Sequence, residues 1–281
     1  MGLIPQLYRD GKNRVLSSRW QTGNSPIPDT APLMYRYGGA MEELEISARK
    51  NRVLNALPKS ELHQLLPLME RISLCSRQVL DRPGAVTEFV HFPLDSVLSL
   101  IASTQEGETV EVATVGNEGA TGMIAVLSGS RMRTQQGTLV KVSTLISGSI
   151  IRMRVDAFEA AVERSSEVNR CVLRYLNVLF TQLVLSASCN RLHSLEQRCA
   201  RWLLACKDRS QADEVAVTQE LLAEMLGVRR QSIDHVLGEL ESKHMIECLR
   251  GSIQLNDFSG LASVACECYH LAKERLDSFL V

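Results

Sequence analysis

The chain has 281 residues, 45% of them hydrophobic, which is enough for two domains that each bury a core. Its formal net charge is −1, so no overall positive field draws it to nucleic acid. No hydrophobic run near the N-terminus has the length found in a signal peptide, and no apolar stretch reaches the roughly 18 residues of a membrane-spanning helix. These features predict a cytoplasmic protein that has no contact with a membrane.

Residues 1–42 contain prolines among scattered glycine, serine and asparagine without sustained periodicity, and this composition predicts a disordered extension. Apolar residues at helical spacing follow, and Pro58 and Pro67 divide them into short helices. From residue 71 to residue 155 the period changes towards two, as at Val110 and Val112, and turn signals separate many short apolar runs. That pattern predicts a small β-roll or barrel.

Helical spacing returns over residues 161–192. One stripe of this helix, with the 4-3-4 spacing of a coiled-coil seam, consists of Val172, Leu176, Leu179 and Leu183. The stripe predicts a helix that pairs with its copy in a homodimer. A second apolar stripe lies beside it, so the alternative is a helix buried within a larger domain.

Residues 218–240 have the pattern of two short helices joined by a tight turn. Thr218 is a suitable N-cap for the first helix, and Gly227 ends it because glycine adopts a positive φ readily. Two apolar runs around residues 250–252 then predict a β-hairpin wing. A helix-turn-helix followed by a wing is typical of proteins that read DNA, and the alternative is a helical hairpin that only packs. From residue 258 onward an amphipathic helix is expected to cover the core of this domain.

The stretch TQELLAEMLGVRRQSIDHVLGELESKHMIE, with SLEQRCARWLLAC before it and the wing after it, resembles the DNA-binding domain of the Crp/Fnr transcription regulators. The resemblance implies an α+β chain in three parts. Residues 43–160 would form a cyclic-nucleotide-binding-like β-roll that serves as a sensor domain. Residues 161–192 would form a long dimerisation helix, and residues 193–281 a winged helix-turn-helix domain with a C-terminal helix. The implied partners are double-stranded DNA, a second copy of the chain and RNA polymerase.

The same resemblance assigns base reading to Arg230, Gln231 and His235. Most members of the family carry Glu and Arg where this chain has Gln231 and His235, so the operator is expected to differ from the usual consensus. Arg229 on the turn and Arg250 at the wing tip are expected to hold phosphates. The full set predicted to bind DNA is Thr218, Gln219, Arg229, Arg230, Gln231, Ser232, His235 and Arg250.

Family members that bind cyclic AMP hold the ribose with a Gly-Glu pair and the phosphate with an Arg followed by Ser or Thr. In the matching segment, residues 116–134, Arg133 and Thr134 fit the phosphate part. Glu118 precedes the glycines and no Glu follows them, so we expect an unknown effector other than cyclic AMP. The alternative function is a small-molecule-sensing module of the same fold that no longer binds DNA.

The eight cysteines lie mostly in predicted helices, which favours reduced thiols packed as small hydrophobic groups. Redox members of the family bind an iron–sulfur cluster through N-terminal cysteines, whereas the first cysteine here is Cys75. Cys266 and Cys268 are interpreted as core residues because no His or Cys pair at zinc-ligand spacing stands with them. We therefore expect no metal and no cofactor. No nucleophile is accompanied by a base and an orienting group, so we also expect no enzymatic activity.

Overall fold

The computed structural model describes the backbone of residues 33–278 and the side chains of residues 41–129 and 137–278. Residues 39–281 belong to one unit. The disordered extension predicted for residues 1–42 lies outside the described residues as far as residue 32. From there helix α1 runs over Leu33–Ala48, so regular structure begins earlier than the sequence prediction placed it. The last proline of this region is Pro32, so no proline lies inside α1.

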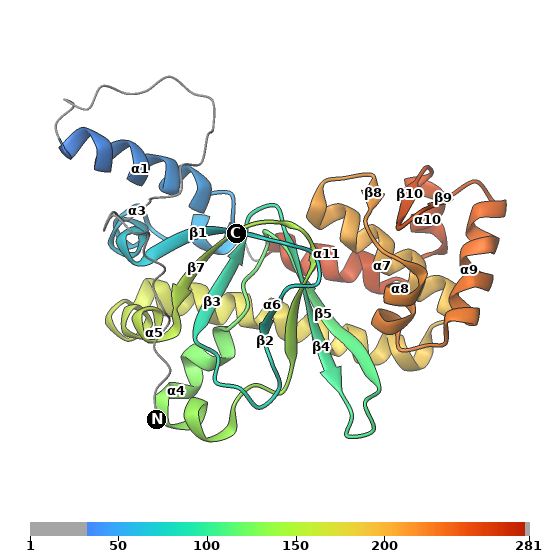
Figure 1. The fold of residues 1–281 in the computed structure, drawn as a ribbon, viewed down its shortest axis with the longest axis horizontal. Helices are drawn as coiled ribbons and strands as arrows, with labels where there is room; N and C mark the ends of the chain where they lie inside the picture. Colours follow the sequence, from blue (N-terminus) through green and yellow to red (C-terminus); the bar gives the residue numbers. More distant parts are fainter. Residues whose placement is uncertain (1–32, 279–281) are drawn as a thin grey trace, which may run out of the picture. The chain divides into compact units, whose positions relative to one another are not determined.

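Seven of the described strands form the N-terminal β-roll, in two antiparallel sheets with the orders β1-β7-β3 and β2-β6-β4-β5 (Figure 1). The strands are β1 (Met69–Leu74), β2 (Val79–Asp81), β3 (Phe89–Pro93), β4 (Val97–Ser103), β5 (Thr109–Val115), β6 (Lys141–Ile146) and β7 (Gly148–Arg154). The register places Val90 opposite Met153 and Phe92 opposite Ile151, and all four side chains are buried. Phe92 also meets Phe158 edge-on, with 5.7 Å between the ring centroids. This apolar interior is the core of the β-roll.

Short helices flank the β-roll. They are α2 (Arg52–Asn55), α3 (Lys59–Leu65), the 3-10 helix η1 (Leu66–Leu68), α4 (Met123–Gln136) and α5 (Val155–Arg164). Pro58 caps α3 and Pro67 lies inside η1, so the prolines divide this region as predicted. Asn51 caps α2 and donates its side-chain amide to the carbonyls of Pro93 and Gly119 at 2.9 and 2.8 Å, which fixes α2 to the β-roll.

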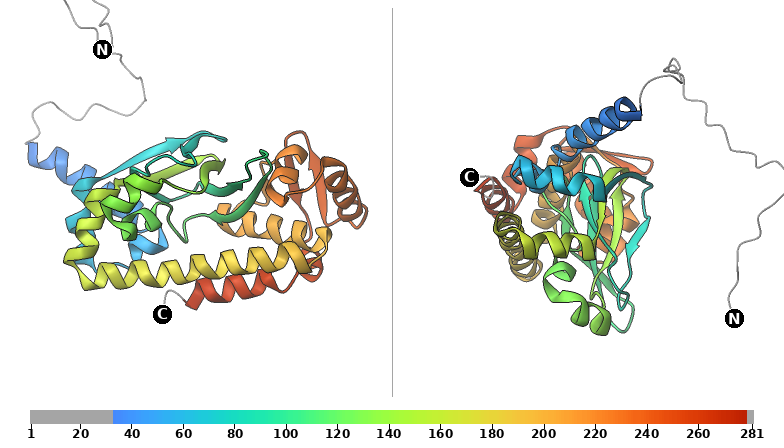
Figure 2. Two further views of the ribbon diagram at one scale, coloured as in Figure 1. Left: turned by 90° about the horizontal axis from the view of Figure 1, so that it is seen from below. Right: turned by 90° about the vertical axis from the view of Figure 1, so that its left-hand side faces the viewer.

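Helix α6 (Ser166–Leu192) has 27 residues and runs beside the β-roll (Figure 2). Ser165 caps its N-terminus by accepting a hydrogen bond from the Val168 N–H at 3.4 Å. Tyr175 donates its hydroxyl to the Ala120 carbonyl at 2.8 Å, on the face that packs against the β-roll. The buried residues of this face are Val168, Cys171, Val172, Tyr175, Val178 and Leu179.

The prediction that no apolar stretch reaches membrane-spanning length is corrected at α6. Among the described residues, α6 is long and apolar enough to cross a membrane by length and composition, with a mean hydropathy of 1.3 over an 18-residue stretch. One such helix is weak evidence, because the core helix of a soluble protein passes the same test. Here one face of α6 belongs to the core of the β-roll.

The C-terminal domain begins with α7 (Leu195–Ser210), whose N-terminus is closed by a capping box. A small antiparallel sheet follows with the order β8-β10-β9, and its strands are β8 (Glu214–Val215), β9 (Ile246–Leu249) and β10 (Ser252–Leu255). The core of this domain is continuous with one end of the β-roll. Val97, Ile101 and Leu145 of the β-roll belong to the same buried cluster as Trp202 and Leu203 of α7.

The single C-terminal helix expected from residue 258 is two helices, α10 (Phe258–Val264) and α11 (Cys268–Ser278). Ala265 adopts an extended conformation, with φ −60° and ψ 148°, and turns the chain between them. α10 packs on α7 and buries Leu261 in the winged-domain core, as expected. α11 instead runs beside α6 (Figure 2). The last helix therefore connects the C-terminal domain to the long helix.

Candidate nucleic-acid interface and its junction with the long helix

Helices α8 (Gln219–Leu226) and α9 (Arg230–Ser242) form a helix-turn-helix at the predicted place. Thr218 caps α8, because its side-chain oxygen accepts the Leu221 N–H at 3.2 Å. Gly227 ends α8 with a φ of 63°. A Cβ at this glycine would lie 3.1 Å from the side chain of Val110 in β5, so both the backbone conformation and the close approach favour glycine.

Helix α9 has one apolar face and one polar face. The buried side chains are Ile233, Val236, Leu237 and Leu240. On the opposite side lies an exposed polar surface, here called the recognition face, which consists of Arg229, Arg230, Gln231, Ser232 and His235. The structure thus brings together five of the residues predicted to bind DNA, whereas Thr218 and Gln219 are half-buried at the start of α8.

Acidic side chains lie beside Arg230 and His235 on the recognition face. Arg230 forms ion pairs with Glu220 of α8 and with Asp234, the latter at 3.9 Å. His235 lies 3.4 Å from Glu239. All of these side chains are at least 45% exposed, so solvent screens the pairs and phosphates can displace the acids at little cost.

The wing is the hairpin of β9 and β10, which pair antiparallel with Ile253 opposite Cys248. Gly251 adopts a φ of 90° in its turn, a conformation that other residues rarely reach. Arg250 precedes this glycine and is exposed at the tip. Its guanidinium is therefore free to meet solvent or a partner at the end of the wing.

The segment predicted to resemble a nucleotide cassette is occupied by contacts within the chain. Glu118 is 3% exposed and accepts hydrogen bonds from Arg209 Nε at 2.6 Å and from the Gly116 N–H at 3.0 Å. A Cβ on Gly119 would lie 2.5 Å from the Tyr175 hydroxyl, so α6 fills the space above this glycine. The Glu118 carboxylate of this segment is thus bound to α7. Arg133 and Thr134 lie in α4, where the side chains are outside the described residues.

A second carboxyl group joins the β-roll to the C-terminal domain. Glu111 of β5 accepts hydrogen bonds from Trp202 Nε1 at 2.7 Å and from the Ser99 hydroxyl at 2.5 Å. Burial raises the pKa of Glu111 to about 7, against the opposing effect of these two hydrogen bonds. A pocket of about 300 Å³ lies beside Glu111 and Glu118. Its other lining residues include Arg52, Asn117, Gln182, Arg209 and Lys273.

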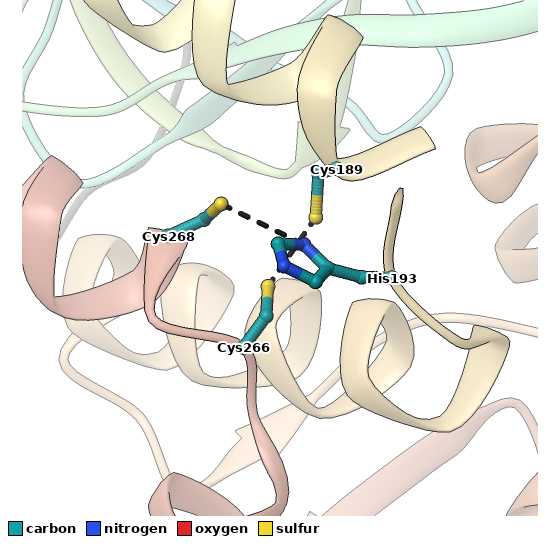
Figure 3. A group of neighbouring side chains, drawn as sticks. All are labelled: Cys189, His193, Cys266 and Cys268. Atoms are coloured by element: carbon teal, nitrogen blue, oxygen red, sulfur yellow. Dashed lines mark hydrogen bonds between the residues drawn. The ribbon is translucent and has the colours of Figure 1, made fainter. Parts of the chain in front are cut away.

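Cys266 and Cys268 are buried core residues, as interpreted, but the expectation that no His or Cys stands with them is wrong. Both are buried, and they meet Cys189 and His193 from the end of α6 (Figure 3). One ligand atom from each of these four residues lies within 4.8 Å of the other three. These four residues are here called the junction cluster. They could not be grouped from the sequence, because Cys189 and Cys266 are 77 positions apart. The local spacings, Cys-x3-His and Cys-x-Cys, are the only signal in the sequence.

The seam predicted on α6 is also corrected. Val172 and Leu179 are 0% and 7% exposed because they pack against the β-roll of their own chain. Leu176 is partly buried against the same core, and Leu183 alone of the four is exposed. The apolar side chains that α6 presents to solvent are Leu173, Phe180, Leu183 and Val184, at 53%, 65%, 37% and 46% exposure.

The C-terminal domain matches a known family of DNA-binding domains. Residues 197–264 match the family model of the Crp-like helix-turn-helix domain. The global nitrogen regulator of Nostoc sp. strain PCC 7120 is 25% identical over 184 residues, which cover 62% of this chain and 79% of that protein.

Solved structures of low sequence identity share the fold. A transcriptional regulator of the Crp/Fnr family from Eubacterium rectale has a TM-score of 0.60 at 14% identity, over 75% of this chain and 96% of its own. FixK2 from Bradyrhizobium japonicum has a TM-score of 0.59 at 13% identity, over 70% of this chain and 98% of its own. The fold is therefore the predicted one: an N-terminal β-roll, a long helix and a C-terminal helix-turn-helix domain. Two of these proteins are described as regulators, the Nostoc protein as a global nitrogen regulator and the Eubacterium rectale protein as a transcriptional regulator.

Proposed function

We propose that this chain is a Crp/Fnr-type transcription regulator, which acts as a homodimer whose paired recognition helices read a near-palindromic operator. Regulators of this family are soluble, bind DNA and usually act as dimers, and a cytoplasmic location agrees with this role. The observation that carries the proposal is the recognition face, an exposed polar surface at the start of a helix whose other face is buried. In a helix-turn-helix, these positions of the second helix meet base edges in the major groove.

The residues of the recognition face have different roles in this proposal. Arg230 in the first turn of α9 donates two hydrogen bonds to a guanine, and Gln231 and His235 contact neighbouring bases. Arg229 on the turn and Arg250 at the wing tip hold backbone phosphates. Thr218, Gln219 and Ser232 complete the contact with the sugar–phosphate chain through hydroxyl and amide groups.

The charge balance of the domain favours specific over non-specific binding. Glu220 and Asp234 neutralise Arg230 until DNA is present, which lowers the attraction to an arbitrary sequence. Only a site that offers Arg230 a base with two acceptors compensates for the loss of these ion pairs. The chain therefore depends on direct reading of bases more than a strongly basic DNA-binding protein does.

The dimer contact in this proposal is the exposed stripe of α6. Leu173, Phe180 and Val184, with Asn177 between the first two, follow the 4-3-4 spacing of a coiled-coil seam. An exposed apolar stripe of this kind on a soluble protein marks a contact surface. A second copy of α6 fits it, because two identical stripes related by a twofold axis bury one another. Asn177 would then set the register of the pair.

The sensor domain, in this proposal, responds to an effector other than cyclic AMP, and the dimer acts on transcription through RNA polymerase. The commitment of Glu118 to Arg209 supports the first point, since it leaves the ribose position without its carboxylate. Catalysis is not part of the proposed function.

Selection of binding sites from a random DNA library, followed by sedimentation, tests the proposal. The wild type should select two inverted half-sites whose centres are one helical turn apart, about 10 base pairs, and should sediment as a dimer. Phe180→Asp with Val184→Asp should give a monomer that has lost the operator, because unpaired charges in a dry interface cost several kcal/mol each.

The matched control carries Leu68→Asp with Leu139→Asp, two exposed apolar residues that do not belong to α6. It should remain a dimer and bind the same operator. Failure of the wild type to retard any selected DNA would favour the alternative, a sensing module without DNA binding. A Phe180 and Val184 variant that stays dimeric would remove α6 as the seam.

A further inference from the structure

The junction cluster joins three parts of the chain at one point. Cys189 lies in the last turn of α6, and His193 is the residue that ends this helix. Cys266 lies between α10 and α11, and Cys268 is the first residue of α11 (Figure 3). The three thiols are 0%, 1% and 4% exposed, so the cluster is closed to solvent on its sulfur side.

We propose that Cys189, His193, Cys266 and Cys268 bind a single zinc ion as a four-coordinate structural site. Three thiolates and one imidazole are a ligand set that structural zinc prefers, and four protein ligands close the coordination sphere. The established roles of the fold, DNA reading and effector sensing, do not require this group of residues. The inference is therefore independent of the proposed function.

The interatomic distances suit one tetrahedral ion. In a tetrahedral site with Zn–S bonds of about 2.3 Å, ligand atoms lie about 3.8 Å apart. Cys189 Sγ is 3.3 Å from Cys266 Sγ, and Cys268 Sγ is 3.8 Å from His193 Nδ1. Every pair of ligand atoms lies within 4.8 Å. Shifts of a few tenths of an ångström to about one ångström would bring all four to bonding distance of a common centre.

The imidazole of His193 is oriented as a metal ligand is. Its Nδ1 atom faces the cysteines, and its Nε2 atom lies 3.2 Å from a carboxylate oxygen of Glu267. An outer carboxylate that accepts the second ring N–H fixes the tautomer and the ring plane of a ligating histidine. Glu267 stands between Cys266 and Cys268, so the same short segment supplies two sulfur ligands and the group that orients the nitrogen ligand.

The charge of the occupied site has a counterpart in α7. A divalent ion with three thiolates and a neutral imidazole has a net charge of −1. Arg198 and Arg201 interact electrostatically with the thiols of the cluster, and the buried Nε atom of each has no hydrogen-bond partner among the described residues. Buried cationic groups of this kind stabilise thiolates, which are the form that binds metal.

Other uses of these residues explain fewer of the observations. A disulfide between Cys189 and Cys266 needs a sulfur–sulfur distance of about 2.05 Å and leaves Cys268 and His193 without a role. An iron–sulfur cluster contains several metal ions, whereas four ligand atoms within 4.8 Å of one another surround the space of one. A plain apolar core does not call for an inward-facing imidazole with an outer carboxylate.

The position of the site indicates its consequence. The ion would tie the end of α6, the entry to α7 and the start of α11 together, at the point where the chain passes from the long helix to the helix-turn-helix domain. If the proposed function holds, the metal fixes the orientation in which the recognition faces are presented. Metal binding itself can be measured without DNA.

Metal analysis of the full-length chain, purified without a histidine tag, tests the proposal. After dialysis against zinc chloride and then metal-free buffer, elemental mass spectrometry should find roughly one zinc per chain. Cys189→Ser, Cys266→Ser and Cys268→Ser should each reduce zinc at least tenfold. Cys75→Ser and Cys248→Ser, outside the cluster, should retain it. Cobalt in place of zinc should give the strong visible absorption of a tetrahedral thiolate site.

A further variant covers the case in which the serine variants do not fold. His193→Cys should keep one metal per chain, and its cobalt spectrum should shift because a fourth sulfur replaces nitrogen. The proposal is overturned if the wild type binds no zinc, if thiol titration finds Cys189 and Cys266 joined in a disulfide, or if His193→Cys leaves the cobalt spectrum unchanged.

Discussion

The recognition face and the junction cluster differ in how they hold polar groups. On the recognition face, Arg230 is 57% exposed and pairs with acids that are themselves exposed. In the junction cluster, the three thiols are at most 4% exposed and face one another and an imidazole. Exposed ion pairs contribute little to stability and exchange partners readily, whereas buried polar groups require fixed partners. The recognition face is therefore suited to bind a partner reversibly, and the junction cluster to hold an ion permanently.

This difference predicts that mutations on the recognition face and mutations in the junction cluster change different measured properties. Changes on the recognition face should alter DNA binding with little effect on the free energy of unfolding, since surface substitutions usually stay within about 0.5 kcal/mol. Changes in the junction cluster should alter the free energy of unfolding first. The predictions below test this division, in order of decreasing effect.

The largest effect is expected from removal of the metal at the junction cluster. A ligand that binds only the folded state, at about 1,000 times its dissociation constant, stabilises that state by about 4 kcal/mol. A strong zinc chelator should therefore lower the free energy of unfolding of the zinc-loaded wild type by about this amount. Denaturant titration followed by circular dichroism, with and without the chelator, measures the difference.

Two variants sharpen this measurement. Cys75→Ser, which changes an exposed thiol of the β-roll region, should respond to the chelator as the wild type does. Cys266→Ser should already be destabilised and should not respond further. An equal response of Cys266→Ser and the wild type would place the chelated metal elsewhere in the chain.

The next effect concerns Arg230 on the recognition face. Arg230→Ala should remove about 1–3 kcal/mol of discrimination at one base pair of each half-site and leave preferences at other positions unchanged. Arg250→Ala should instead weaken binding to all sequences alike and reduce the slope of log K against log salt by about one. Site selection and a salt series on both variants provide the comparison. A selected motif that is unaltered in Arg230→Ala but altered in Arg229→Ala would shift the reading register by one residue.

The helix-turn-helix could be predicted from the sequence because its signals are local. Capping by Thr218, the turn at Gly227 and the apolar spacing of α9 all fall within 23 residues that fold against one another. The family resemblance rested on the same continuous stretch. The fold class followed from it, and the β-roll also showed the short alternating runs of its strands.

The junction cluster and the exposed stripe of α6 could not be predicted in the same way. Cys189 and Cys266 come together only because α11 folds back beside α6, a tertiary contact that no spacing reveals. On α6, apolar residues form more than one stripe, so Val172 and Leu173 both fit a seam with the right spacing. Which of them faces solvent depends on the β-roll packed against the helix, and that decided against Val172.

The smallest effect is expected at Glu111 of β5, which hydrogen-bonds Trp202 of α7. Burial raises the pKa of Glu111 from 4.5 to about 7, while the hydrogen bonds from Ser99 and Trp202 and the charges of Arg209 and Arg201 act in the opposite direction. Because the folded state binds this proton more tightly than the unfolded state, the stabilisation is complete below about pH 4.5 and is lost as the pH rises through 7.

In Glu111→Gln the side chain stays neutral at every pH and can still accept the Trp202 N–H, so this loss should disappear. Between pH 5 and pH 8 the free energy of unfolding of the wild type should fall relative to that of the variant by about 1–2 kcal/mol, allowing for partial exposure of the group. Taking the difference between the two proteins cancels the other groups that titrate in this range, including the buried His91, whose lowered pKa acts with the opposite sign. Glu108 is an exposed acid immediately before β5, so the pH profile of Glu108→Gln should follow that of the wild type. Parallel pH profiles for the wild type and Glu111→Gln would mean that Glu111 is ionised in the folded protein over this pH range. The hydrogen bond between Glu111 and Trp202 would then resemble the exposed ion pairs of the recognition face, which contribute little to stability.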